Sequence, residues 1–242
     1  MKFRPVALLV VLALAGSSFA QTPFPKNPAV PAAKAPEPAY AKVEDVPGLP
    51  RVLLLGDSIS IAYHLAVRGQ LQGRANVHRP AENCADSAHG IKSLDSWLGA
   101  GKWDVIHFNF GLHDVKYLDA AGQYVRPDKG KQVASPAVYE ANLRTIVARL
   151  RKTGAKLIFA TTTPVPAQSR GRVENDEVRY NAVAVRVMRE LGVAVDDLHA
   201  FVKPRQAQLQ RPSNVHFTDE GSARLAEVVV ASIAPVLPAA KK

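Results

Sequence analysis

The sequence predicts an α/β fold in which helices cover both faces of a parallel sheet, an α/β/α sandwich. Two observations support this prediction. Short apolar runs rich in Val, Ile, Leu and Phe alternate with longer segments whose apolar residues recur at helical spacing. Runs that are apolar throughout, rather than at every second residue, are typical of strands buried on both faces. The expected strands cover residues 52–55, 105–110, 157–161 and 193–195.

Three of the intervening segments carry signals for the ends of helices. Ser135, followed by a proline, predicts the start of one helix, and Gly154 predicts its end. Apolar residues recur between them at helical spacing: Val138, Leu143, Ile146, Val147 and Leu150. A second helix is expected over residues 174–191, and Thr218 is expected to cap a last helix that contains Leu225, Val229 and Ile233.

The residues before 51 are expected to form a targeting segment and a linker rather than part of the folded domain. Lys2 and Arg4 precede an apolar run over residues 6–16, and small residues follow it, which predicts a secretory signal peptide over residues 1–20. That run is too short for a membrane span, which needs about 20 residues. Residues 21–50 hold many of the prolines and predict a semi-rigid linker. One domain over residues 51–242, exported to the periplasm or secreted, is therefore expected.

Composition excludes several classes of protein. Hydrophobic residues make up 47% of the chain, so wholesale disorder is not expected. The formal net charge is +10, but the basic residues are scattered and no nucleic-acid-binding motif accompanies them. The single cysteine rules out a disulfide within the chain, and no nucleotide-binding loop or zinc-protease motif is present. We therefore expect no cofactor, no metal and no nucleic-acid partner.

Ser58 follows the first expected strand directly, in Gly56-Asp57-Ser58. In an α/β fold this position presents a hydroxyl beside the free amides of a helix start, although such a serine is often only a helix cap. A nucleophilic serine needs a base, and His216, just before the last helix, is the best placed of the seven histidines. A loop histidine bonded to a helix cap is the alternative. His64 and His199 are expected on helix surfaces, and His78 and His107 on strands.

Together these motifs resemble the SGNH/GDSL hydrolase family, in order and spacing, over residues 51–237. The first block is Gly56-Asp57-Ser58, the third is Gly111-Leu112-His113-Asp114, and the last begins at His216. The resemblance implies a sheet of about five strands and ester hydrolysis with Ser58 as nucleophile and His216 as base. It also implies an oxyanion hole made of the Ser58 amide, an amide of the second block and a side chain of the third block.

Two positions depart from the family pattern. His113 stands where the family has asparagine, and a neutral imidazole can donate one N–H to an oxyanion, with Asp114 as a neighbour that could fix its tautomer. Ser213 stands where the family has the aspartate that orients the histidine. A backbone carbonyl, Ser213 itself, or Asp196 or Asp197 are the alternatives, and impaired catalysis is another; we expect a working dyad of Ser58 and His216.

The second block is expected within residues 83–87. Ala85 matches the position of the family's oxyanion glycine, and alanine can serve there if the turn does not require a positive φ. Gly90 is the alternative. Cys84 is expected to be a small buried thiol rather than a nucleophile, because no basic partner or helix start marks it.

Substrate choice is expected to come from the long stretch of residues 115–134. This stretch carries Tyr117, Tyr124, Arg126 and Lys129, which suit a sugar or another polar ester better than a long acyl chain. With export, this leads to the hypothesis of an esterase that removes small acyl groups, above all acetyl, from a small-molecule or polysaccharide substrate. The alternatives are a lipase-like esterase of longer acyl chains and a noncatalytic carbohydrate-binding protein with the same fold.

Overall fold

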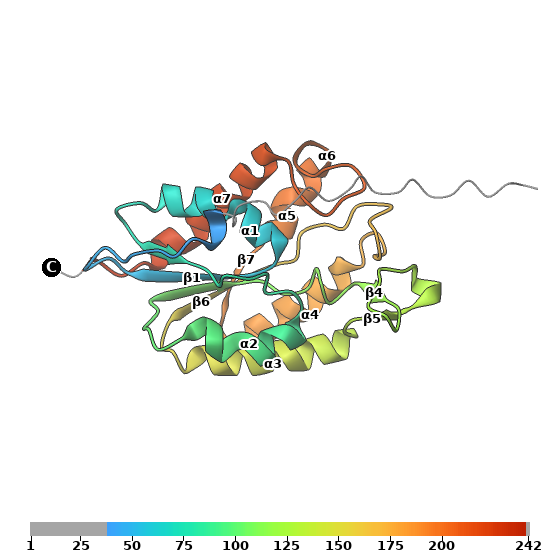
Figure 1. Ribbon diagram of the computed structural model, residues 1–242, viewed down its shortest axis with the longest axis horizontal. Helices are drawn as coiled ribbons and strands as arrows, with labels where there is room; N and C mark the ends of the chain where they lie inside the picture. Colours follow the sequence, from blue (N-terminus) through green and yellow to red (C-terminus); the bar gives the residue numbers. More distant parts are fainter. Residues whose placement is uncertain (1–37, 241–242) are drawn as a thin grey trace, which may run out of the picture. The chain divides into compact units, whose positions relative to one another are not determined.

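The computed structural model describes residues 38–240 (Figure 1). The predicted signal peptide and residues 21–37 of the predicted linker lie outside the described residues. The α/β prediction is confirmed, because the described chain contains a five-stranded sheet whose neighbouring strands are all parallel. In spatial order the strands are β2 (Asn76–His78), β1 (Arg51–Leu55), β3 (Val105–Phe108), β6 (Lys156–Ala160) and β7 (Ala194–Asp196).

The central strands are buried because apolar side chains occupy both of their faces. Every residue of β3 and all but the first residue of β1 are buried. Leu55 pairs with Phe108, and Phe108 pairs with Phe159. The carboxyl ends of β1, β3 and β6 therefore lie side by side, and the loops that follow them meet at one edge of the sheet.

Helices cover the two faces of the sheet in two separate layers (Figure 1). One layer contains α1 (Ser58–Gln70), α5 (Leu198–Val202), α6 (Gln206–Leu209) and α7 (Asp219–Ile233). The other contains α2 (Ser87–Leu98), α3 (Pro136–Arg151) and α4 (Glu177–Glu190). The predicted caps are present: Ser135 Oγ accepts from Val138 N–H at 3.3 Å, and Thr218 Oγ1 accepts from Gly221 N–H at 2.9 Å.

Residues 38–50, which we expected in the tether, pack against the domain. A short 3₁₀ helix, η1 (Pro38–Tyr40), contacts α1, and Ala39 is buried. The Asn76 side chain accepts from Val46 N–H at 2.9 Å and donates to Val46 O at 3.0 Å. These bonds satisfy the backbone of a proline-containing segment that composition alone marked as a linker. Over residues 38–240, no helix has the length and apolar character needed to cross a bilayer.

The stretch 115–134 is a small hairpin at the carboxyl edge of the sheet rather than an irregular loop. It contains β4 (Tyr117–Leu118), η2 (Pro127–Lys129) and β5 (Lys131–Gln132), with the two strands antiparallel. Tyr117 N–H donates to Gly171 O at 2.8 Å, which ties the hairpin to the loop between β6 and α4. Two separate loops therefore approach each other near the end of the sheet.

Candidate active site

Ser58 is the first residue of α1, where the buried strand β1 turns into the helix. Asp57 is the N-cap, and its Oδ1 accepts from Ile59 N–H at 2.9 Å. Gly56 has to be glycine for steric reasons, because a Cβ there would lie 2.6 Å from Ser60 Cβ. As the first helical residue, Ser58 has an N–H with no partner inside the helix. The turn thus presents a half-buried hydroxyl beside an available amide.

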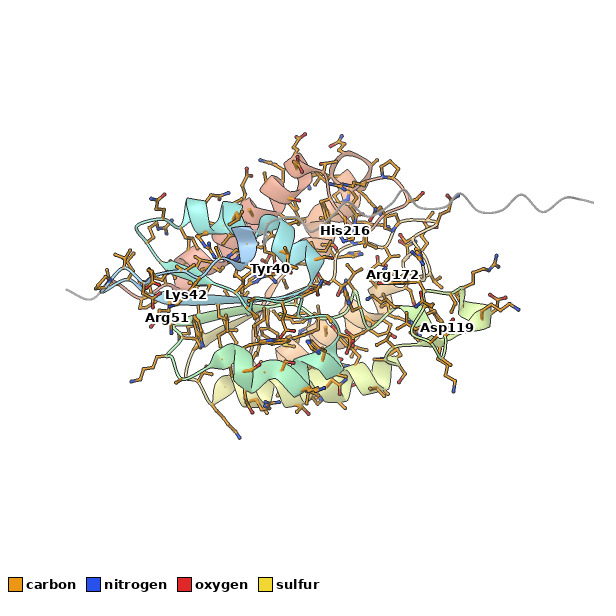
Figure 2. The ribbon with its side chains drawn as sticks, in the orientation of Figure 1. Tyr40, Lys42, Arg51, Asp119, Arg172 and His216 are labelled. Carbon is orange, nitrogen blue, oxygen red and sulfur yellow. The ribbon has the colours of Figure 1, made fainter. Side chains whose placement is uncertain are left out.

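His216 meets Ser58 across a sequence separation of 158 residues. Its Nε2 lies 2.9 Å from Ser58 Oγ, which is hydrogen-bond distance. The loop that carries His216 is fixed by its neighbours Val215 and Phe217, both of which are buried, and by a β-bridge between Gln210 and Phe217. Figure 2 shows His216 in the helical layer above the sheet, at the end opposite Arg51. The structure therefore brings together the two side chains proposed as nucleophile and base.

Asn214 is the residue that orients His216, and the sequence analysis did not identify it. Its Oδ1 accepts from His216 N–H at 3.0 Å and lies 2.8 Å from His216 Nδ1. Because the backbone N–H can bond only to the amide oxygen, the oxygen is the atom that faces the ring, and Nδ1 must carry a proton. Nε2 is then unprotonated and accepts from the Ser58 hydroxyl, as a general base requires.

The other candidates for this role have different partners. The Ser213 hydroxyl lies 3.4 Å from Gln168 Oε1, in a residue with a φ of 53°. Asp196 Oδ2 lies 3.0 Å from His107 Nε2 in the core, and Asp197 Oδ1 accepts from Thr161 Oγ1 at 2.9 Å. Asp196 and Asp197 are therefore wrong as orienting acids. The signal for Asn214 was its position two residues before His216, from which an Asx side chain can bond the backbone two residues on.

Partial desolvation of the ring favours the neutral form of the His216 imidazole, although the residue as a whole is exposed. The pKa of His216 is lowered, first by burial, and the Arg172 and Arg211 charges add to this effect. The buried Asp57 carboxyl acts in the opposite direction and raises the pKa of His216. Asn214 is uncharged, so Asp57 is the carboxyl that favours an imidazolium at this position.

His113 is held as a hydrogen-bond donor by Lys116. The Lys116 ammonium lies 2.7 Å from His113 Nδ1, and because an ammonium only donates, Nδ1 accepts and the ring proton sits on Nε2. Burial and the charge of Lys116 lower the pKa of His113 to about 3. Asp114, the neighbour we expected to fix this tautomer, accepts instead from the amide and hydroxyl of Ser87, so that expectation was wrong.

The second block lies beside Ser58, but its amides differ from the expectation. Cys84 N–H donates to Gly56 O at 3.2 Å, which places this block against the end of β1. Ala85 has a φ of 50°, and its N–H donates to Asn83 Oδ1 at 2.9 Å. The turn therefore does require a positive φ, and the Ala85 amide already has a partner.

Gly90 and Cys84 take no part in the site chemistry. Gly90 lies inside α2, where its N–H donates to Asp86 O at 3.0 Å, and a Cβ there would meet Phe110 at 2.6 Å. Gly90 is therefore excluded as the alternative amide donor. Burial raises the pKa of the Cys84 thiol to about 12, so it is protonated and poorly nucleophilic.

A cleft of about 710 Å³ opens beside Ser58 and His216. It lies between α1 and α7, which pack against each other, and the segment before β1 contributes to its wall. Its lining is mixed, with Tyr40, Ile61, Leu65, Arg211, Phe217 and Ser222 among the contributors. A substrate group of moderate size can therefore reach the hydroxyl from this side.

Comparison with known proteins relates the whole of this arrangement to one family. A model of the GDSL-like lipase/acylhydrolase family matches residues 54–224. A comparison with curated protein sequences found no significant match.

Solved structures share the fold at low sequence identity. A lipase/acylhydrolase from Enterococcus faecalis has a TM-score of 0.64 at 19% identity, over 80% of this chain and 100% of its own. An acetylxylan esterase from Geobacillus stearothermophilus has a TM-score of 0.60 at 20% identity, over 76% of this chain and 94% of its own. The acetyl xylan esterase AlAXEase has a TM-score of 0.62 at 15% identity, over 76% of this chain and 99% of its own.

Proposed function

Because the chain belongs to the GDSL-like lipase/acylhydrolase family, we propose that it is an exported serine esterase that removes small acyl groups, above all acetyl, from a carbohydrate. The observation that carries the proposal is the continuous set of contacts from Ser58 Oγ to His216 Nε2 and from His216 Nδ1 to Asn214 Oδ1. Export rests on the N-terminal sequence pattern.

The reaction follows from the tautomers of the two histidines. Ser58 Oγ bonds to the acyl carbon while its proton passes to His216 Nε2, and the carbonyl electrons move onto the oxygen. The Ser58 N–H and the His113 Nε2–H are the donors proposed to hold that oxyanion. When the intermediate collapses, the bond to the alcohol breaks and His216 returns the proton to the leaving oxygen. Water, activated by His216, then hydrolyses the acyl ester on Ser58.

A carbohydrate acetate as the substrate is supported by two features. Tyrosine and cationic side chains border the site on the side of the hairpin, and such groups suit polar substrates. Two of the structural neighbours carry the name acetyl xylan esterase. The apolar residues of the cleft, Ile61 and Leu65, favour a second candidate, an esterase of longer acyl chains.

Three substrates and one variant distinguish these candidates. The purified protein is expected to release acetate from acetylated xylan and to cleave 4-nitrophenyl acetate, and Ser58→Ala should abolish both reactions. Ser60→Ala is a poorer control because Ser60 is buried, so Ser96→Ala on the exposed face of α2 serves as the matched control. Preference for 4-nitrophenyl esters of long acyl chains would favour the lipase-like candidate. Glycan binding without turnover of any ester would identify a noncatalytic module.

A further inference from the structure

Three cationic side chains surround one tyrosine ring at the edge of the site. The distances from the ring centroid of Tyr124 are 5.0 Å to Lys116 Nζ, 5.4 Å to Arg170 Cζ and 5.9 Å to Arg172 Cζ. Tyr124 and Lys116 belong to the hairpin region, and the two arginines belong to the loop between β6 and α4. We refer to these four residues as the cationic cluster.

Within residues 38–240, none of the three cations forms an ion pair within 4.0 Å. Arg172 is half-buried, and burial lowers the pKa of its guanidinium. Its Nε donates to Leu112 O at 2.9 Å and its Nη1 to Arg170 O at 3.4 Å, and its side chain also bonds the Tyr124 hydroxyl, so its polar partners are all uncharged. A partly buried cation without a carboxylate partner is unfavourable unless something else supplies the negative charge.

The neighbouring carboxyl groups do not supply a compensating negative charge beside the cationic cluster at the surface. Asp57, whose charge acts on Arg172, is fully buried beneath the site. Asp119, on the same hairpin, accepts from the N–H groups of Ala121 and Gln123 at 2.9 and 2.8 Å. The cationic cluster therefore presents net positive charge to whatever occupies the site.

The cationic cluster is close to the reacting groups. Lys116 bonds His113, and Arg172 holds the carbonyl of Leu112, the residue before His113. The charge of Arg172 acts on Asp57, His113 and His216 alike. Figure 2 shows Arg172 and His216 at the same end of the molecule, with Arg172 on the side of the hairpin.

We propose that the cationic cluster is a subsite for a carboxylate carried by the substrate, so that the preferred ester lies on an acidic sugar rather than on a neutral one. This inference rests on the proposed function. Guanidinium groups match carboxylates in geometry and bind them in a bidentate manner. Tyr124 adds an aromatic face with a polar hydroxyl, which suits a sugar ring that carries the carboxylate.

Two probes that differ in one group test this inference. O-acetylated glucuronic acid and O-acetylated glucose carry the same ester, and only the first has a carboxylate. We expect kcat/KM to be about tenfold higher for the glucuronic acid probe, which corresponds to one charge-assisted hydrogen bond. The ratio should fall towards one as the salt concentration rises from about 0.01 to 1 M, because salt screens exposed charges.

Arg170→Glu tests the cluster directly, because the Arg170 side chain is exposed and contacts the Tyr124 ring. The ratio of kcat/KM for the two probes is expected to fall about tenfold. Arg74→Glu is the matched control, since Arg74 is exposed in the turn before β2, at the opposite edge of the sheet. The control should leave the ratio unchanged.

The two proposals fail in distinguishable ways. Equal kcat/KM values for the two probes, or equal effects of Arg170→Glu and Arg74→Glu on their ratio, would overturn the carboxylate subsite and leave the esterase intact. Absence of turnover with both probes and with 4-nitrophenyl acetate would overturn the esterase and the subsite together.

Discussion

Two histidines of the site are held in opposite tautomers by neighbours of opposite chemistry. Asn214 is an acceptor, so His216 carries its proton on Nδ1 and offers a lone pair to Ser58. Lys116 is a donor, so His113 carries its proton on Nε2 and offers an N–H. Neither neighbour is a carboxylate. The comparison teaches that each imidazole takes its role from whether its neighbour accepts or donates a hydrogen bond, rather than from the neighbour's charge. An accepting neighbour makes one imidazole a base, and a donating neighbour makes the other an anion-binding donor.

The largest expected effect is the loss of the base. His216→Ala removes the group that takes the Ser58 proton, and kcat should fall about 10⁴-fold. The loop should remain folded, because Val215 and Phe217 are buried on either side. Turnover of 4-nitrophenyl acetate and the thermal unfolding midpoint measure the two quantities. A rate within tenfold of the wild type would show that His216 is not the base.

The next largest effect is expected from the loss of His113, the proposed side-chain donor to the oxyanion. His113→Ala should lower kcat by about 10²- to 10³-fold, the usual result of removing one oxyanion donor. His113→Asn is the sharper variant, since an asparagine amide can also donate one N–H, and it should recover much of the rate. Equal loss in both variants would indicate that His113 shapes the loop rather than binding the oxyanion.

Two variants of Asn214 test whether His216 needs a hydrogen-bond acceptor at this position or a negative charge. Asn214→Ala removes the acceptor and should lower kcat about 10- to 100-fold, because the imidazolium that forms in the reaction loses one hydrogen bond to a charged group. Asn214→Asp keeps the acceptor and adds a negative charge, which favours the imidazolium and raises the pKa of His216.

The pH profile reads out that difference. The neutral form of His216 is the base, and burial lowers its pKa, so kcat/KM of the wild type should decline only below about pH 6.5. In Asn214→Asp this decline should move to higher pH, while kcat above it stays equal or rises. An unchanged profile would contradict the contact between residue 214 and the His216 ring.

Most of the scaffold and the reacting pair could be predicted from the sequence. The strand before Ser58 is apolar from Val52 to Leu55, and the last helix begins just after His216. In a fold of alternating strands and helices, the loop before that helix can return to the carboxyl end of the first strand, which brings His216 to Ser58. The orienting residue could not be found in this way. Family spacing pointed to Ser213, but Ser213 has a φ of 53°, and the side chain that reaches the ring is that of Asn214.

The sequence also failed to predict the burial of polar side chains that depend on one hydrogen-bond partner. His64 was expected on a helix surface, yet it is fully buried and its Nε2 lies 2.6 Å from Arg68, one helical turn later. The cationic cluster was predicted only in part. The sequence analysis named Tyr124 but neither Arg170 nor Arg172, which come from a loop about 46 residues further along the chain. Arg126, also singled out, pairs instead with Asp128. Contacts between two separate loops leave no periodic signal in sequence.

The smallest expected effect comes from the neighbour of the donor. Lys116→Met removes the group that bonds His113 Nδ1, so the two neutral tautomers of His113 become closer in energy and the pKa of His113 rises from about 3. Because only part of the population then presents Nε2–H, kcat for the neutral ester 4-nitrophenyl acetate should fall about three- to tenfold. Lys92→Met, on the exposed face of α2, is the matched control. Nitrogen-15 NMR of the imidazole reports the tautomer directly, and a His113 that stays fully protonated on Nε2 in Lys116→Met would show that the loop, and not Lys116, sets its tautomer.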